Sequence, residues 1–212
     1  MAKFKAVLFD LDGTVVDTRD HIFFAFNYAL EKQGFERIDL RKMAELAGIP
    51  LHKCYSLIAP GGDVERLVEH HREFQYENTH LVKGFDGAEE VLKALKENDV
   101  KIGIVTARYR KSTDYILEQM KLDPYCQALV YGDDPFKGKP HPQPFEETAK
   151  MLGEKPVDCL VVGDGCADII GGNAAGSMTC RALYGYGGME PCKGKADFEI
   201  RSLPELLAIV LG

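Results

Sequence analysis

The chain has 212 residues, a formal net charge of −7 and 45% hydrophobic residues, as expected for a globular protein with one large or two small domains. The acidic balance argues against nucleic acid or an anionic membrane as a partner. No apolar run reaches the roughly 18 residues of a membrane span, and no signal-peptide pattern is found at the start. Six cysteines without metal-ligand spacing indicate reduced thiols and a cytoplasmic location.

The first predicted strand, residues 6–9, leads two carboxylates into a turn. Its apolar run suits a strand that is covered on both faces of a parallel sheet, and Asp-Gly marks the turn. Asp10 and Asp12 project to the same side because they are two residues apart. Such a pair repels unless a cation lies between the groups, and hard oxygen ligands suit Mg²⁺. A carboxylate can also be a nucleophile that forms an aspartyl-phosphate, although the pair taken alone also fits a simple polar turn.

Residues 16–81 interrupt this α/β pattern with apolar residues at helical spacing. One group comprises Ile22, Phe23, Phe26, Ala29 and Leu30, and a weaker one comprises Val64, Leu67, Val68 and Phe74. We predict a helical insertion whose aromatic stripe is hydrophobic core rather than a cofactor site.

From residue 82 onward, predicted helices and strands alternate. Helices are expected at 87–98, 110–121 and 142–152, and strands at 100–105, 127–131 and 157–162. This alternation predicts an α/β fold with a parallel sheet and right-handed crossovers.

Two polar residues follow later strands of this region. Thr106 comes directly after Val105, where its hydroxyl and the following N–H groups could bind phosphoryl oxygens or cap a helix. Lys139 precedes Pro140, which favours an extended backbone, and its ammonium could neutralise a carboxylate and a transferring phosphate together. A solvated lysine is the alternative.

Asp164 and Asp168 follow a further apolar strand. On a helix starting near Asp164 they would share one face, as metal ligands or as partners of the helix dipole. Because ligands of open α/β sheets bind outside the carboxyl ends of the strands, the strand-end residues predict one common site.

In this order, the four segments resemble the signature motifs of the haloacid dehalogenase-like superfamily of hydrolases, over essentially the whole chain. Within it, the strings GKPHPQPF, GNAAG and GYG are most similar to the phosphoglycolate phosphatase-like and β-phosphoglucomutase-like group. The resemblance implies a Rossmann-like core, residues 1–15 and 82–212, and a helical cap domain, residues 16–81, inserted after the first strand.

The resemblance also implies catalytic roles. Asp10 matches the nucleophile, and Asp12 matches the general acid and base. Thr106 and the backbone of Ala107 match the phosphate-binding segment, and Lys139 matches the motif lysine. Lys137 is a rival for that last role, but the family lysine stands directly before proline.

In this family the cofactor is Mg²⁺, and its ligands would be Asp10, the backbone carbonyl of Asp12, and Asp164, with Asp168 as a further carboxylate beside them. Tentative substrate contacts are Arg41, His52 and Lys53, which flank the loop Gly48-Ile49-Pro50, together with Arg108, two residues after Thr106. By resemblance, that loop lies over the site.

The resulting hypothesis is a Mg²⁺-dependent phosphatase that hydrolyses a small, phosphoglycolate-like phosphate monoester through an aspartyl-phosphate. The alternatives are a β-phosphoglucomutase-like mutase and a phosphatase of sugar phosphates, nucleotides or pyrophosphate. A non-enzymatic phospho-receiver module is remote, because receivers need no insertion of this length. A dehalogenase is disfavoured because it needs neither a metal nor the acid Asp12. The expected partner is a small phosphorylated metabolite, and the expected state is a monomer or homodimer.

Overall fold

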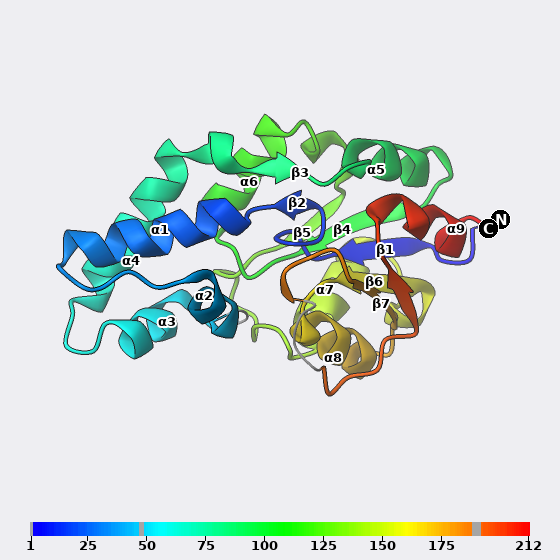
Figure 1. Cartoon of the computed structure of the whole chain (residues 1–212). Helices are drawn as coiled ribbons and strands as arrows, with labels where there is room; N and C mark the ends of the chain where they lie inside the picture. Colours follow the sequence, from blue (N-terminus) through cyan, green and yellow to red (C-terminus); the bar gives the residue numbers. More distant parts are fainter. Residues whose placement is uncertain (1, 47–48, 188–191) are drawn as a thin grey trace. The chain divides into compact units, whose positions relative to one another are not determined.

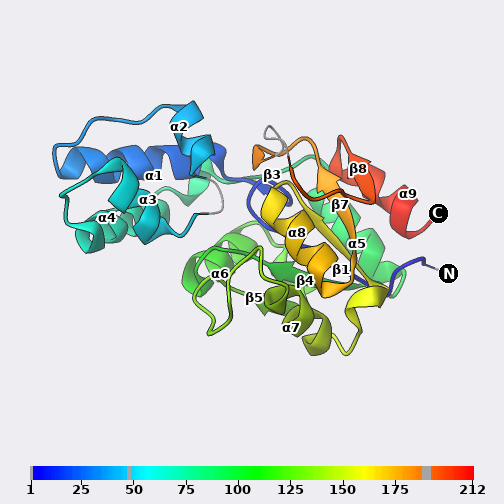
Figure 2. The ribbon, with the colours of Figure 1, turned by 90° about the horizontal axis from the view of Figure 1, so that it is seen from below.

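A computed structural model describes residues 2–46, 49–187 and 192–212. Two compact units are present, one formed by Met1–Asp17 and Lys83–Gly212 and the other by Thr18–Val82 (Figures 1 and 2). The predicted boundaries after residues 15 and 81 lie within two residues of these. We call them unit 1 and unit 2, and describe each by itself.

Unit 1 is built on a sheet of six parallel strands, in the order β5-β4-β1-β6-β7-β8. The strands are β1 (Ala6–Phe9), β4 (Lys101–Val105), β5 (Ala128–Val130), β6 (Cys159–Gly163), β7 (Met178–Ala182) and β8 (Phe198–Ile200). Every residue of β1 is fully buried, as expected for a strand covered on both faces. The predicted Rossmann-like α/β class is confirmed.

Helices cover both faces of this sheet. The helices α5 (Ala88–Glu97) and α9 (Leu206–Val210) pack together on one face, and α7 (Gln143–Met151) and α8 (Cys166–Ala175) pack on the other (Figure 1). The helix α6 (Arg110–Gln119) connects β4 to β5, and short 3-10 turns lie at η2 (Asp123–Tyr125), η3 (Pro156–Asp158) and η5 (Leu203–Glu205). A small antiparallel pair, β2 (Val16–Asp17) and β3 (Lys83–Gly84), lies where the chain leaves and re-enters unit 1.

The helices and strands predicted for unit 1 are present, with ends within two residues of those expected. One start differs in a way that matters for the site. The helix expected near Asp164 begins at Cys166, because Gly165 is its N-cap and donates its N–H to Oδ2 of Asp168 at 3.2 Å. Asp164 therefore lies in the turn after β6, while Asp168 lies in the first turn of α8.

Unit 2 is helical. Its elements are α1 (Arg19–Lys32), α2 (Leu40–Glu45), α3 (Leu51–Ile58), α4 (Val64–Glu77) and the 3-10 turn η1 (Thr79–Leu81). Phe26 and Leu30 of α1 are buried with Leu67 and Val68 of α4 in one hydrophobic cluster, so the interpretation of the apolar stripes as core is confirmed. Across the described ranges, none of the helices combines the length and the apolar character that crossing a membrane requires.

The order of the strands determines where a ligand can bind. From β1 the chain passes to β4 and β5 on one side and then returns to β6 on the other side of β1. Connections from β1 and from β6 therefore run in opposite directions, which opens a crevice at their carboxyl ends. Asp10 and Asp164 are the residues that directly follow these two strands.

Candidate active site

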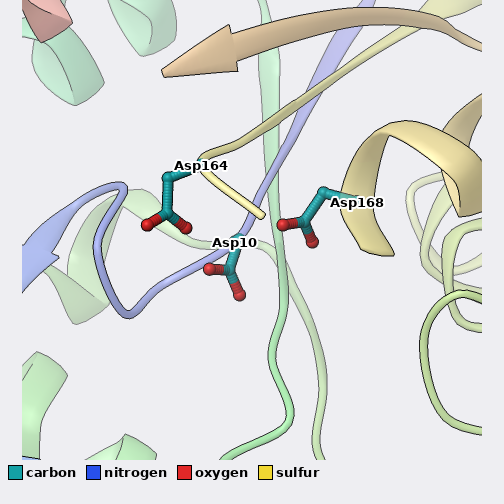
Figure 3. A group of neighbouring side chains, drawn as sticks. All are labelled: Asp10, Asp164 and Asp168. Atoms are coloured by element: carbon teal, nitrogen blue, oxygen red, sulfur yellow. The ribbon is translucent and has the colours of Figure 1, made fainter. Parts of the chain in front are cut away.

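Three carboxylates meet beyond the carboxyl ends of β1 and β6. The Asp10 N–H donates to the carbonyl of Val162 at 2.8 Å, which places the ends of the two strands side by side. Figure 3 shows the side chains of Asp10, Asp164 and Asp168 pointing toward a common space, and oxygen atoms from all three lie within 4.8 Å of one another. All three residues are buried.

Lys139 ties this cluster to the sheet. Its ammonium donates to Oδ1 of Asp10 at 2.6 Å, to Oδ1 of Asp168 at 2.7 Å and to the carbonyl of Val105 at 3.1 Å, which uses all three of its N–H donors. Burial alone would lower the pKa of Lys139, but the two carboxylates outweigh burial and raise it. The ammonium is therefore a fixed positive charge in the site. Lys137, the rival lysine, is exposed.

Asp164 is held by backbone and hydroxyl groups. Its N–H donates to the Thr14 hydroxyl at 3.1 Å, and its Oδ2 accepts the N–H of Gly187 at 2.7 Å. Tyr184 donates its hydroxyl proton to the carbonyl of Thr14 at 2.7 Å and so braces the same turn. Gly13 has a φ of +84°, and a Cβ there would collide with Oδ2 of Asp164, so glycine is required. The sequence did not indicate Thr14, Tyr184 or Gly187 as site residues, although the GYG string was visible.

The electrostatics of the cluster favour a cation. Burial raises the pKa of Asp164 to about 6, and burial together with the neighbouring Asp168 and Asp164 carboxylates raises that of Asp10 despite Lys139. One ammonium faces three carboxylates, so the ionised cluster keeps an excess of negative charge. An all-oxygen donor set of this kind fits a hard divalent cation such as Mg²⁺.

Asp12 is paired with Arg108. Nε of Arg108 lies 3.2 and 3.1 Å from the two carboxylate oxygens of Asp12, and Nη2 lies 2.6 Å from Oδ1. Arg108 belongs to unit 1 and is buried. Sequence reasoning selected Arg108 as a substrate contact and did not foresee its pairing with Asp12.

Thr106 directly follows β4 and is buried, and the exposed Ala107 comes next. The Thr106 N–H donates to the carbonyl of Val130 at 3.0 Å, which extends the pairing of β4 with β5. Its hydroxyl oxygen accepts the N–H of Arg108 at 3.0 Å. The helix α6 begins at Arg110 with Tyr109 as N-cap, so Thr106 is not the cap of that helix.

The predicted substrate contacts Arg41, His52 and Lys53 belong to unit 2. Arg41 on α2 and Lys53 on α3 are exposed, and Nε2 of His52 lies 3.3 Å from a carboxylate oxygen of Glu65. The predicted substrate loop includes Gly48, which lies outside the described residues.

Two of the six cysteines are joined in a disulfide. Cys166, in the first turn of α8, and Cys192 form a disulfide, with Cα atoms 5.1 Å apart. The prediction that all six thiols are reduced is therefore wrong for this pair. The two cysteines are 26 positions apart in sequence and show no motif spacing, so the pair became evident only once the fold brought the segments together. Cys54, Cys126, Cys159 and Cys180 are free.

Fold and site together define an α/β enzyme with an acidic cluster and a fixed lysine at the carboxyl ends of its central strands. The family model of the haloacid dehalogenase-like hydrolases matches residues 7–182, and the chain belongs to this family. It is therefore a hydrolase, as predicted.

Among curated relatives, the pyrophosphatase PpaX of Bacillus cereus strain AH820 is 32% identical over 210 residues, which cover 98% of this chain and 97% of the relative. PpaX of Bacillus thuringiensis strain Al Hakam is also 32% identical with the same coverage. Among solved structures, a predicted phosphoglycolate phosphatase from Haemophilus somnus 129pt superposes with a TM-score of 0.87 at 24% identity, covering 99% of both chains. A predicted phosphatase from Clostridium acetobutylicum gives a TM-score of 0.82 at 26% identity over 96% of both chains.

Proposed function

We propose that this chain is a Mg²⁺-dependent phosphatase that acts on small phosphorylated metabolites through an aspartyl-phosphate at Asp10. The observation that carries the proposal is the arrangement around Lys139, which holds Asp10 at 2.6 Å beside the carboxylates of Asp164 and Asp168. An ammonium at this distance offsets part of the effect of burial on the pKa of Asp10 and so favours its ionised, nucleophilic form. It can also neutralise an incoming phosphoryl group.

The reaction would proceed in two displacements. An oxygen of Asp10 attacks phosphorus while the bond to the leaving oxygen breaks. Asp12 enters this step protonated, gives its proton to that oxygen and becomes the carboxylate that pairs with Arg108. Water then attacks the phosphorus of the aspartyl-phosphate, Asp12 takes a proton from it, and the bond to Asp10 breaks to release phosphate. The Thr106 hydroxyl and the Ala107 N–H would hold the phosphoryl oxygens, which fits their place directly after β4.

The residues that would hold Mg²⁺ are Asp10, Asp164 and the backbone carbonyl of Asp12. When bound, Mg²⁺ neutralises charge on the phosphoryl group and relieves repulsion among the carboxylates. Asp168, in the first turn of α8, accepts hydrogen bonds from the Lys139 ammonium at 2.7 Å and from the Gly165 N–H at 3.2 Å. Its role would be to orient Lys139.

Two substrate classes deserve direct comparison. Pyrophosphate is favoured by the relatives named pyrophosphatase, which are 32% identical over nearly the whole chain. A phosphoglycolate-like monoester is the second candidate, suggested by the motif strings of the core. We also propose a cytoplasmic location and a monomer or homodimer.

A panel of pyrophosphate, phosphoglycolate, a hexose 6-phosphate and a hexose 1-phosphate, assayed with Mg²⁺ and then with EDTA, tests the proposal. We expect release of phosphate that depends on Mg²⁺ and is abolished in Asp10→Asn. Full turnover in EDTA, or in that variant, would contradict it. Conversion of the hexose 1-phosphate to the 6-phosphate without release of phosphate would show a mutase instead.

A further inference from the structure

Arg108 contacts two residues of the proposed active site, Asp12 and Thr106, but no step of the proposed reaction assigns it a role. Its guanidinium binds both carboxylate oxygens of Asp12, at distances between 2.6 and 3.2 Å. Its backbone N–H donates to the Thr106 hydroxyl at 3.0 Å. The residues joined by the guanidinium are 96 positions apart in sequence, so this ion pair connects the turn after β1 with the turn after β4.

The guanidinium is itself held in place. The side chain of Arg108 is 6% exposed, and Nη1 donates to the hydroxyl of Ser112 on α6 at 2.9 Å. A buried charge is costly unless it is paired and hydrogen-bonded, so the Asp12 carboxylate is the partner that makes this position of the arginine tolerable. Rotation of the Asp12 carboxylate away from Arg108 would leave the buried guanidinium without this carboxylate partner.

The geometry of the Arg108–Asp12 pair indicates that Arg108 orients the Asp12 carboxylate as well as neutralising its charge. A planar guanidinium that binds both oxygens of a carboxylate restricts rotation of the carboxylate plane, whereas a lysine at the same place would act as a point charge. The Asp12 carboxyl must be oriented toward the leaving oxygen in the first step and toward the attacking water in the second. A misplacement of such a group by about 1 Å can cost on the order of 100-fold in rate.

We propose that Arg108 is a positioning residue that fixes the carboxylate plane of Asp12 for proton transfer to the leaving group. The inference rests on the function proposed above and deepens it. Arg108 acts through Asp12 and does not bind the phosphoryl group, so its contribution depends on how much the leaving group needs a proton.

Arg108→Met and Arg108→Lys test this directly, with Arg110→Met as the matched control. Arg110 also pairs with an aspartate, since Nη2 lies 2.6 Å from Oδ1 of Asp134, but its side chain is 54% exposed and lies outside the site. The substrates are 4-nitrophenyl phosphate, whose leaving group needs little protonation, and phenyl phosphate, whose leaving group needs more. The quantity compared is kcat/KM, because it reports only the steps up to formation of the aspartyl-phosphate and is independent of its hydrolysis.

We expect Arg108→Met to lower kcat/KM for phenyl phosphate by about 10- to 100-fold and for 4-nitrophenyl phosphate by less than about threefold. Arg108→Lys should recover part of the loss, and Arg110→Met should behave as wild type. In an Asp12→Asn background, Arg108→Met should cause no further loss, because residues that act through one another are not additive. Equal losses on both esters, or a further loss in that background, would show that Arg108 binds substrate or supports the fold, and would overturn the proposal.

Crystal structures of wild type and Arg108→Met give a readout that does not require turnover. We expect the Asp12 carboxylate to rotate in the variant, and an unchanged carboxylate plane would overturn the positioning role. A wild-type protein that hydrolyses none of the esters would instead contradict the proposed function, so the two failures can be told apart.

Discussion

The ion pairs of the candidate active site in unit 1 are far less exposed than the ion pairs of unit 2. In unit 1, Lys139 is bound to Asp10 and Asp168 at 2.6 and 2.7 Å, with side chains between 4 and 11% exposed. In unit 2, the ion pair of Arg66 with Glu69 joins side chains that are 57 and 52% exposed. Exposed pairs contribute about 0–1 kcal/mol and exchange partners readily, whereas a buried network has few alternative arrangements.

From this difference we infer that the buried groups of unit 1 carry out the proposed chemistry, and we propose that exposed side chains of unit 2 determine selectivity among substrates. The buried groups of unit 1 are each held by several partners, as a reaction centre requires. In unit 2, Arg41 and Lys53 are exposed, so we expect the fold to tolerate their substitution. We therefore expect substitutions of Asp10, Asp164 or Lys139 in unit 1 to affect every substrate, and substitutions of Arg41 or Lys53 in unit 2 to affect substrates differently.

The largest effect should come from Asp10→Asn. The amide oxygen can still accept from Lys139, so the fold should persist, but an amide is a poor nucleophile, and kcat should fall by roughly 10⁴-fold or more on every substrate. Steady-state assays of the purified variant measure this, with the exposed Asp20→Asn of α1 as the control. Hydrolysis near the wild-type rate would exclude Asp10 as the nucleophile.

The disulfide in unit 1 should matter for stability. Cys166 and Cys192 are 26 residues apart, and a crosslink over a loop of this length contributes roughly 2–4 kcal/mol to the free energy of unfolding. Urea denaturation of Cys192→Ser should show a loss of that size, and a reducing agent should lower wild type to the same level while leaving the variant unchanged. Cys126→Ser, which removes a free thiol, is the control. Equal free energies of unfolding for oxidised and reduced wild type would contradict a stabilising role of the Cys166–Cys192 disulfide.

Binding of Mg²⁺ should depend on pH. Burial raises the pKa of Asp164 to about 6, so the proton competes with the cation below that pH, and the ionised form that binds Mg²⁺ is restored above it. Affinity should therefore fall by about tenfold or more for each pH unit below 6, because the Asp10 carboxylate, whose pKa is also raised, takes up a proton as well. Isothermal titration calorimetry between pH 5 and 8 measures this, and Asp164→Asn should bind weakly throughout. An affinity that is constant over this range would contradict the role of Asp164 as a ligand.

The smallest effects should come from three exposed polar side chains of unit 2. Alanine at Arg41, His52 or Lys53 should change the ratio of kcat/KM between pyrophosphate and an aryl phosphate by roughly fivefold, the equivalent of about 1 kcal/mol for an exposed charge pair. Arg66→Ala, an exposed cation on α4 paired with Glu69, is the control. Equal changes on both substrates would assign these residues to stability rather than to selectivity.

Local sequence was sufficient for the parts of the site that adjoin a strand. Asp10, Thr106 and Asp164 each follow an apolar run of strand formers, and parallel strands bring their carboxyl ends to one edge. The helical insertion was also predictable, since its apolar spacing depends on residues only three or four positions apart. The helix expected to start near Asp164 begins two residues later, at Cys166, with Gly165 as its N-cap.

Contacts between distant segments could be seen only in the folded chain. The pair of Arg108 with Asp12, the N–H of Gly187 on Asp164 and the disulfide of Cys166 with Cys192 join residues between 23 and 96 positions apart. No local periodicity or spacing reports such contacts, because they depend on which loops the packing of the sheet and helices brings together. For the same reason the residue types at strand ends identify the chemistry, while tertiary packing determines how each group is oriented and held.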